Sequence, residues 1–327
     1  MSILVTGGAG YIGSHTCKAL LREGFDLIIL DDFSSGREEL LTGGKVIREN
    51  LQNLNAVHNI FKNHNISAVL HFASLIQVAE SFSNPHKYYT ANLINSLNLL
   101  DAMLSHGISR FIFSSSAAVY GIPRRIPIDE EHPCQPINPY GRTKFFIEKI
   151  LADYTRAYGL KYVSLRYFNA AGADPQGDLG EMHDPETHLI PNILLSLLTG
   201  NSRLKVFGTD FPTKDGTAVR DYIHVSDLAE AHIMALKYLL KGCQSQIINL
   251  GSSQGFSVLE IIKAAEKVTG RDIKFEKKPK RKGDVPILLA SNNKAEKILG
   301  WKARFSDMDT IIQTAWRWHQ RILRFTG

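Results

Sequence analysis

Apolar residues in the first half of the chain form short runs separated by segments of helical periodicity. The runs at Ala68–Phe72, Phe111–Ser114 and Tyr162–Tyr167 predict strands, and segments such as Tyr88–Leu104 and Arg142–Ala157 predict helices. Alternating strands and helices joined by short loops indicate an α/β fold with a doubly wound parallel sheet. Ligands of such a sheet bind beyond the carboxyl ends of its strands.

The regular alternation ends after Asn169. Residues 170–187 are rich in Gly, Pro, Asp and Glu and predict a long loop, which in a compact domain usually has a function. A smaller C-terminal α/β domain is expected to follow and to cover the edge of the sheet. Its expected elements are a helix at Leu189–Leu198, a strand at Leu204–Phe207, and helices at Val258–Val268, Asn293–Leu299 and Met308–Leu323. Two strands at Asp221–His224 and Gln246–Leu250, around a helix at Asp227–Leu240, are expected to return to the nucleotide-binding part.

The first apolar run, Ile3–Val5, leads through three glycines into a helical segment. Gly7, Gly10 and Gly13 have the spacing G-x-x-G-x-x-G. Glycine allows a tight turn and lets a pyrophosphate approach the backbone without a Cβ in the way. The helix N-terminus that follows presents N–H groups and the positive end of the helix dipole to a phosphate. A Rossmann-type nucleotide site is therefore expected here.

A second apolar run, Leu27–Leu30, ends at Asp31. An acidic residue at this strand tip can bind the adenosine ribose hydroxyls and repel a 2′-phosphate, so it favours NAD over NADP. The alternative, a glycine turn that binds no nucleotide, does not explain the acid. We expect an NAD-binding domain over 1–169 with about 220–250, and a substrate domain over 170–219 and 251–327.

Composition excludes several classes of protein. The 327 residues are 44% hydrophobic, but no segment has the ~18 uninterrupted apolar residues of a membrane span. Cys17, Cys134 and Cys243 lie far apart, and no histidine falls in a pattern such as H-E-x-x-H, so neither a disulfide framework nor a metal site is expected. The first strand follows Met1 directly, which leaves no room for a leader and favours a cytoplasmic protein.

The net charge of +6 is compatible with two different partners. Excess positive charge can mean nucleic acid, but it also suits an enzyme that holds two anionic diphosphate ligands. The densest basic run, Lys274–Lys282, is equally well explained as a solvated loop. No nucleic-acid motif accompanies it, so no nucleic-acid partner is expected.

The second chemical signal is Tyr140-Gly-Arg-Thr-Lys144, at a helix start marked by Asn138 and Pro139. Tyr140 and Lys144 lie one helical turn apart on one face. A phenol of pKa ~10 is a poor base at neutral pH, and a nearby ammonium with a cationic nicotinamide would stabilise its phenolate. Alone, this spacing is common in ordinary amphipathic helices.

A buried run that ends in Ser114, Ser115 and Ser116 strengthens the signal. It finishes at the edge of the sheet where ligands bind, and a serine there can share a hydrogen bond with the tyrosine and a substrate hydroxyl. The alternative, serines that only satisfy backbone groups, is strong for Ser114 and Ser115 and weaker for Ser116.

These motifs together resemble the extended short-chain dehydrogenase/reductase superfamily. The blocks that carry the resemblance are the glycine turn, Ser116–Gly121, Tyr140–Lys144 and Arg166–Asn169. Within that superfamily the sequence is most similar to the UDP-glucose 4-epimerases, through Gly10–Thr16, Phe113–Ser116 and the quite specific block Asp215–Val225. The similarity spans essentially the whole chain.

The resemblance implies NAD as cofactor, a UDP-sugar as substrate and a homodimer. Tyr140 would remove the proton of the sugar 4-hydroxyl, Lys144 would lower the tyrosine pKa and hold the nicotinamide ribose, and Ser116 would bridge the substrate oxygen and Tyr140. The implied cofactor contacts are Gly7, Gly10, Tyr11, Ile12, Gly13, Asp31, Asn50, Leu51, Phe72, Ala73, Asn92, Tyr140, Lys144 and Tyr167. The implied UDP-sugar contacts are Ser116, Tyr140, Asn169, His188, Leu189, Phe207, Arg220, Arg281, Asp284 and Leu288.

Four positions depart from the usual pattern of these epimerases. Asn50 stands where an aspartate often reads the adenine amino group, and Ile76 stands where a lysine is frequent. His188 replaces a common asparagine, and Leu288 replaces a bulky tyrosine beside the sugar. The last change leaves UDP-GlcNAc and UDP-uronic acids open as alternative substrates.

The sequence argues against two other functions, 4,6-dehydration of a nucleotide sugar and NAD sensing without catalysis. Related 4,6-dehydratases need an acid and a base after the strand-end hydroxyl residue, and Ala117 and Ala118 cannot transfer protons. A protein that only senses NAD would be expected to lose Tyr140 or Lys144, and both are present. The sequence therefore favours an NAD-dependent 4-epimerase of a UDP-hexose.

Overall fold

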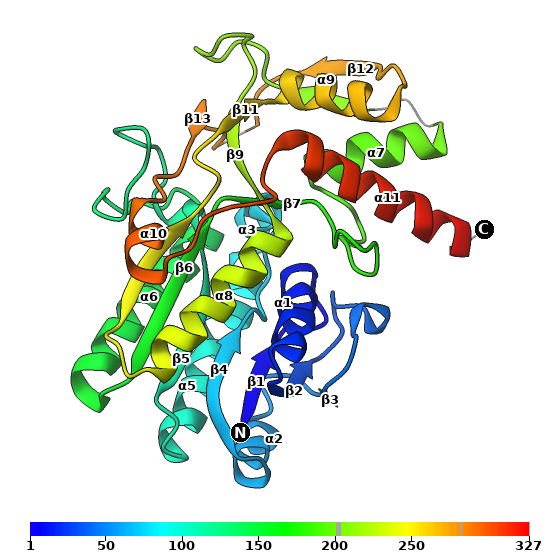
Figure 1. The fold of residues 1–327 in the computed structure, drawn as a ribbon. Helices are drawn as coiled ribbons and strands as arrows, with labels where there is room; N and C mark the ends of the chain where they lie inside the picture. The colour runs from blue at the N-terminus through cyan, green and yellow to red at the C-terminus, as the bar shows by residue number, and fades with distance from the viewer. Residues whose placement is uncertain (201–203, 282, 327) are drawn as a thin grey trace.

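A seven-stranded parallel sheet forms the centre of the larger part of the molecule (Figure 1). The computed structural model describes residues 1–200, 204–281 and 283–326. The sheet has the strand order β10-β6-β5-β4-β1-β2-β3. Its strands are β1 (Ser2–Thr6), β2 (Asp26–Asp31), β3 (Lys45–Arg48), β4 (Ile66–His71), β5 (Arg110–Ser116), β6 (Lys161–Tyr167) and β10 (Gln246–Leu250). The predicted doubly wound sheet is confirmed, and its order reverses between β1 and β4, where ligands of such sheets bind.

Helices cover both faces of this sheet. Side chains alternate along β1, so Ile3 and Val5 pack with one set of helices and Leu4 packs with the other. Both faces are therefore apolar, which explains the continuous apolar runs in the sequence. The first face carries α1 (Tyr11–Arg22), α8 (Val225–Leu240) and α10 (Asn293–Leu299), and the second carries α2 (Leu54–Asn63), α5 (Asn95–Ser105) and α6 (Pro139–Tyr158).

The single helix expected at Tyr88–Leu104 is a composite of three segments. They are α4 (Pro85–Tyr88), the wider π-helical turns of η2 (Tyr89–Ile94) and then α5. Asn92 lies in these wider turns. Its side-chain amide accepts a hydrogen bond from the Leu75 N–H at 2.8 Å and donates one to the Leu75 carbonyl at 3.0 Å. The departure from regular geometry thus places a buried amide against the neighbouring loop.

Several short elements were not predicted. The edge strand β3 has three exposed side chains of four, so it carries no apolar alternation. The other missed strands have only two to four residues, too few to show a period. The missed elements are β3, β7 (Asn169–Ala171), β11 (Gly255–Ser257), β12 (Phe275–Lys278), β13 (Ile287–Leu288), α2, α3 (Val78–Ser83) and the short turns η1 (Glu38–Leu40) and η3 (Ala117–Val119).

The smaller part of the molecule lies beyond the carboxyl ends of the central strands (Figure 1). It has one sheet of β11, β9 and β13, with β7 paired to β9, and a second of β12 and β8. β9, which the sequence placed with the NAD-binding part, pairs in this smaller sheet, whereas β10 joins the central sheet and α8 packs on it. Its remaining elements are α7 (Leu189–Thr199), β8 (Leu204–Phe207), β9 (Val219–His224), α9 (Val258–Thr269) and α11 (Met308–Thr326).

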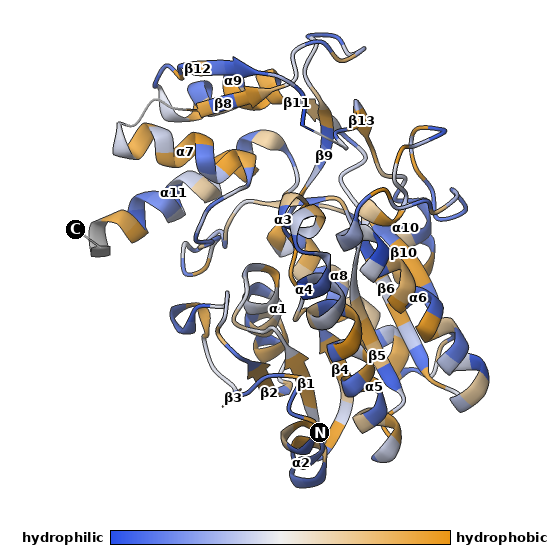
Figure 2. Cartoon of the chain, turned by 180° about the vertical axis from the view of Figure 1, so that it is seen from behind, coloured by the Kyte–Doolittle hydropathy of each residue, from blue (hydrophilic) through white to orange (hydrophobic). Residues whose placement is uncertain are grey.

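The apolar core of this smaller part is shared by α7, α9 and α11, with Ile193, Ile261 and Ile311 fully buried between them. Figure 2 shows β12 in the hydrophilic colour at the outer edge, because three of its four residues are charged. Lys282, part of the expected basic loop, lies outside the described residues. Among the described helices, none is both long enough and apolar enough to cross a bilayer.

Candidate active site

A cavity of about 1370 Å³ lies between the two parts of the molecule. Its walls include the carboxyl ends of β1, β2, β4, β5 and β6 on one side, and α7, β8 and β9 on the other. All the residues that the sequence placed in a cofactor or substrate site line this cavity except Asn92 and Lys144. Those two are buried behind it, at 1% exposure each.

The glycine turn leaves no space for a side chain. Gly7 has φ of +71°, and a Cβ there would lie 2.4 Å from the Ala73 nitrogen. A Cβ at Gly13 would lie 2.2 Å from the Gly7 oxygen. Gly10 caps α1 without a side-chain hydrogen bond, so the first N–H groups of the helix remain available to an anion.

Asp31 joins this turn to the cavity. Its carboxylate accepts hydrogen bonds from the backbone N–H groups of Ala9 and Phe33, both at 2.9 Å. Burial raises the pKa of Asp31, and these two hydrogen bonds oppose the rise. The side chain is therefore held rigidly at the tip of β2, on the wall expected to face an adenosine ribose.

The neighbouring cofactor residues are held by backbone contacts. The N–H groups of Phe72 and Ala73 both donate to the Thr6 carbonyl, at 2.9 and 3.1 Å. Asn50 donates to Asp32 Oδ2 at 2.6 Å and accepts from the Gln52 N–H at 2.8 Å. Its amide is thus already oriented by protein groups, and the amide oxygen keeps a second lone pair for a ligand.

Ser116 and Tyr140 meet at the centre of the cavity wall. Ser116 ends β5, and Tyr140 lies in the first turn of α6, which Asn138 caps through a 2.7 Å bond to the Gly141 N–H. Burial raises the pKa of Tyr140, and a hydrogen bond with Ser116 opposes this rise. Ser116 Oγ also accepts from the Ala118 N–H at 3.1 Å, which fixes its rotamer.

Lys144 lies one turn behind Tyr140. Its Nζ donates to the Ser114 carbonyl at 2.8 Å and lies 5.9 Å from the centre of the Tyr140 ring. Burial lowers the pKa of Lys144 to about 7, against the opposing charge of Glu148. The Tyr140 pKa is raised although Lys144 lies one turn away, because burial outweighs the hydrogen bond with Ser116.

A buried ion pair that the sequence analysis missed supports this group. Arg166 binds Glu148 through two parallel bonds of 2.9 and 2.6 Å, and Ser115 donates to the same carboxylate at 2.7 Å. Both ionic side chains are no more than 4% exposed. The pair connects β6 to α6 and so positions the helix face that bears Tyr140 and Lys144. Its only sequence signal was a charged residue within each predicted buried element.

The opposite wall concentrates positive charge. Burial lowers the pKa of Arg220; Tyr222 and Asp284 oppose this shift, and the Arg281 charge adds to it. Arg281 donates to Asp284 at 3.2 Å and lies 5.1 Å from the centre of the Phe207 ring. Asp284 binds Arg281 and is, of the carboxylates that the structure describes, the one whose charge acts on Arg220, so two guanidinium groups face a single negative charge. The region is therefore net positive and suits a diphosphate.

The remaining expected substrate residues frame this region. Asn169 donates to the Asp221 carbonyl at 3.0 Å. Leu288 on β13 pairs in register with Arg220 on β9 and packs beside Ala117 and Val119. Leu189 and His188 begin α7.

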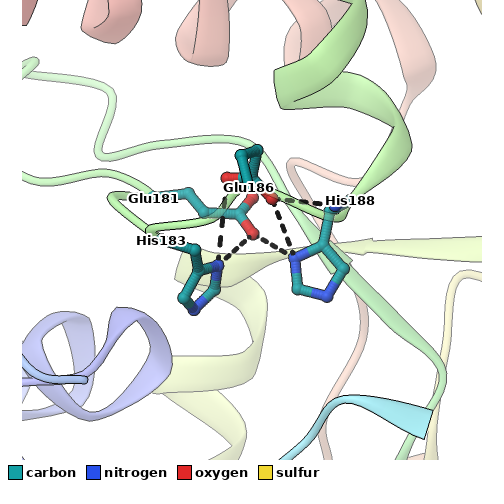
Figure 3. A group of neighbouring side chains, drawn as sticks. All are labelled: Glu181, His183, Glu186 and His188. Carbon is teal, nitrogen blue, oxygen red and sulfur yellow. Dashed lines mark hydrogen bonds and ion pairs between the residues drawn. The ribbon is translucent and has the colours of Figure 1, made fainter. Parts of the chain in front are cut away.

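His188 belongs to a cluster that the sequence patterns did not reveal (Figure 3). Glu181 Oε1 lies 2.8 Å from His183 Nδ1 and also bonds His188 Nδ1. Glu186 oxygens lie 3.9 Å from His183 Nδ1 and 3.7 Å from His188 Nδ1. The spacing E-x-H-x-x-E-x-H matches none of the metal patterns considered, although all four ligand atoms lie within 4.8 Å of one another.

Comparison with known proteins agrees with this geometry. Residues 3–251 match the model of the NAD dependent epimerase/dehydratase family. A UDP-glucose 4-epimerase of Lactobacillus helveticus is 47% identical over 321 residues, which cover 98% of this chain and 97% of that protein.

Two solved structures are also similar over nearly their whole length. A UDP-glucose 4-epimerase from Brucella ovis in complex with NAD has a TM-score of 0.94 at 44% identity, covering 96% of this chain and 97% of that one. One from Bifidobacterium longum in complex with NAD+ and UDP has a TM-score of 0.94 at 38% identity, covering 98% of both chains.

Proposed function

Because this chain belongs to the NAD dependent epimerase/dehydratase family, we propose that it is a UDP-glucose 4-epimerase, which interconverts UDP-glucose and UDP-galactose. The observation that carries the proposal is one cavity that joins a glycine turn, the Ser116–Tyr140 pair and two arginines. NAD held by the glycine turn and Asp31 would supply reversible hydride transfer at the sugar C4.

The residues present fit NAD. The close approach of backbone at Gly7 and Gly13 gives a pyrophosphate access to the N-terminus of α1, and Asp31 suits two ribose hydroxyls. Lys144 and Tyr140 would hold the nicotinamide ribose. We propose that 1–169 with α8 and β10 binds this cofactor, and that the smaller part, which includes β9, binds the UDP-sugar.

The chemistry that the chain contributes is proton transfer and orientation. Tyr140 Oη takes the proton of the sugar 4-hydroxyl as the hydride leaves C4, and gives it back when the resulting 4-ketone is reduced. Ser116 Oγ bridges the sugar oxygen and Tyr140. The positive charge of Lys144 and of an oxidised nicotinamide would together lower the Tyr140 pKa from its raised value.

The opposite wall would hold the nucleotide while the sugar turns. Arg220 and Arg281 would bind the diphosphate, and Asn169 and Phe207 would contact the remainder of the UDP-sugar. With the diphosphate fixed, the 4-keto sugar can rotate and present its other face to the same hydride donor. Dehydration is disfavoured, since Ala117 and Ala118 line the cavity where a dehydratase needs an acid and a base.

UDP-GlcNAc is a second candidate substrate because of Leu288. Its side chain lines the cavity, packs against the cluster of Ala117, Val119, Tyr120 and Ile128, and is smaller than a tyrosine. We expect an N-acetyl group to enter with crowding, at a cost of about 1–3 kcal/mol.

We also propose a cytoplasmic homodimer. Ile94 and Phe146, from the helical layer of η2, α5 and α6, are 48% and 41% exposed, and Phe146 stacks with Tyr89. Exposed aromatic and aliphatic side chains of this kind favour association. The three cysteines are unpaired, as expected in a reducing compartment. Light scattering of the purified protein tests the dimer.

A coupled assay tests the proposed activity. UDP-galactose is supplied to the purified protein, and UDP-glucose is detected by a UDP-glucose dehydrogenase that forms NADH, read at 340 nm. We expect steady product formation. An NAD-binding protein that forms no product from UDP-galactose, UDP-GlcNAc or a UDP-uronic acid would instead be a sensor, and the proposal would be wrong.

A further inference from the structure

We propose that Glu181, His183, Glu186 and His188 form a binding site for a divalent transition-metal ion, with zinc the best match to its donors. The two imidazole nitrogens and two carboxylates converge from one short loop segment (Figure 3). Imidazole with carboxylate is a donor set that zinc accepts in tetrahedral sites. This site is separate from the groups proposed for hydride and proton transfer.

The geometry requires little movement to hold an ion. All four ligand atoms already lie within 4.8 Å of one another. Zinc bonds of about 2.0–2.2 Å would place tetrahedral ligand atoms about 3.4 Å apart. His183 and His188 both direct Nδ1 at Glu181, so an ion would replace the hydrogen-bonded protons between the same atoms.

Charge is the second reason for a cation here. The side chains of Glu181 and Glu186 are only 4% and 9% exposed. Among the described residues, the ion pairs of both glutamates are with the two histidines alone, and no lysine or arginine pairs with them. Two nearly buried carboxylates need compensating charge, which a divalent ion would supply.

A buried histidine next to the cluster points the same way. His319 on α11 is 2% exposed, and within the described part of the chain its Nδ1 has no hydrogen-bond partner. Glu181 is the charged group that acts on it. The neighbouring Trp318 donates to the Glu181 backbone carbonyl at 3.0 Å, which places α11 directly against the cluster. An unsatisfied imidazole near the Glu181 carboxylate fits a polar ligand in this region.

An occupied site would fix one wall of the cavity. His183 and His188 both line it, and Leu189 follows directly at the start of α7. The ion would therefore anchor the segment 181–188 where it meets the proposed UDP-sugar.

Zinc binding to the full chain, purified without a histidine tag and treated with a chelator, tests the proposal. We expect calorimetry to show one saturable Zn²⁺ per chain, with no saturation by Mg²⁺. Saturating zinc should raise Tm by about 3–6 °C. The variant H183N/E186Q should lose at least about 100-fold in zinc affinity. This exceeds the usual loss on replacing a residue that only hydrogen-bonds to a metal ligand.

The matched control is H58N/D101N, which removes another histidine–carboxylate pair, 3.7 Å apart, outside the cluster. It should keep wild-type zinc affinity. The amount of NAD bound to each purified variant shows whether it is folded. If H183N/E186Q does not fold, the single variant E186Q takes its place. Absence of saturable zinc binding by the wild type, or equal binding by the cluster variants, would overturn the proposal.

Discussion

The wall of the cavity that carries the glycine turn and the wall that carries the arginine pair are held in different ways. On the first, backbone atoms approach one another closely and Asp31 is bound by two N–H groups. On the second, side chains from β8, β9 and the segment after β12 meet, and the Arg281 side chain is 61% exposed.

This difference separates what each wall can do. A rigid wall of backbone donors suits a ligand that stays bound, as the proposed NAD does through every turnover. A wall of longer, more exposed side chains can adjust to a sugar that must rotate to present its other face. Substitutions on the first wall should therefore act on all substrates, whereas those on the second should discriminate between them.

The largest expected effect comes from Tyr140→Phe, at the junction of the two walls. Loss of a positioned general base should lower turnover by about 10²–10⁴-fold while NAD stays bound. The control is Tyr158→Phe, on the same helix but 61% exposed, which should be neutral. Near-normal turnover by the first variant would remove Tyr140 from the proposed chemistry.

Gly7→Ala tests the rigid wall. Gly7 and Gly107 share φ of +71°, but only Gly7 has a backbone atom, at 2.4 Å, where a Cβ would lie. Alanine at Gly107 should cost only about 1–2 kcal/mol of unfolding free energy, through its left-handed conformation. At Gly7 it should also lower NAD affinity by about 100-fold, because the turn must open. Equal NAD content in the two variants would show that close approach does not matter.

Cofactor selectivity is the next effect in size. With Asp31 at the tip of β2, a 2′-phosphate should bind less favourably by about 2 kcal/mol, so NADP affinity should be roughly 30-fold below that of NAD. Asp31→Asn should reduce this ratio, whereas Asp32→Asn, whose carboxylate binds Asn50, should not. Calorimetry with both cofactors measures it, and equal affinities in the wild type would refute the assignment.

The smallest expected effect comes from Leu288, on the wall that carries the arginine pair. Leu288→Tyr should lower the rate with UDP-GlcNAc by about tenfold and leave the rate with UDP-galactose nearly unchanged. Undiminished UDP-GlcNAc turnover by this variant, or none by the wild type, would show that Leu288 does not limit the pocket.

The sequence predicted the wall that carries the glycine turn better than the wall that carries the arginine pair. The central sheet, the glycine turn, and the Ser116 and Tyr140 positions were predictable, because periodic runs and fixed local spacings determine them. The short strands β11 and β13 flank β9 in the smaller sheet, and they have too few residues to show any period. The Glu181–His188 cluster depends on how a loop of 170–187 folds, and local propensity does not encode that path.

The raised pKa of Tyr140 was also beyond sequence reasoning. Spacing placed Lys144 beside the phenol, but only the packed structure shows that burial raises the Tyr140 pKa against the hydrogen bond with Ser116. The degree of burial is set by residues from β5, β6 and α6 together, which lie far apart along the chain.

Epimerisation of UDP-galactose in D₂O, followed by proton NMR of the sugar C4 position, is the most direct test of the central claim. If a hydride leaves C4 and returns from the same bound cofactor, the UDP-glucose formed should retain protium at C4. Deuterium at C4 would mean exchange with solvent, and would contradict hydride transfer within this cavity.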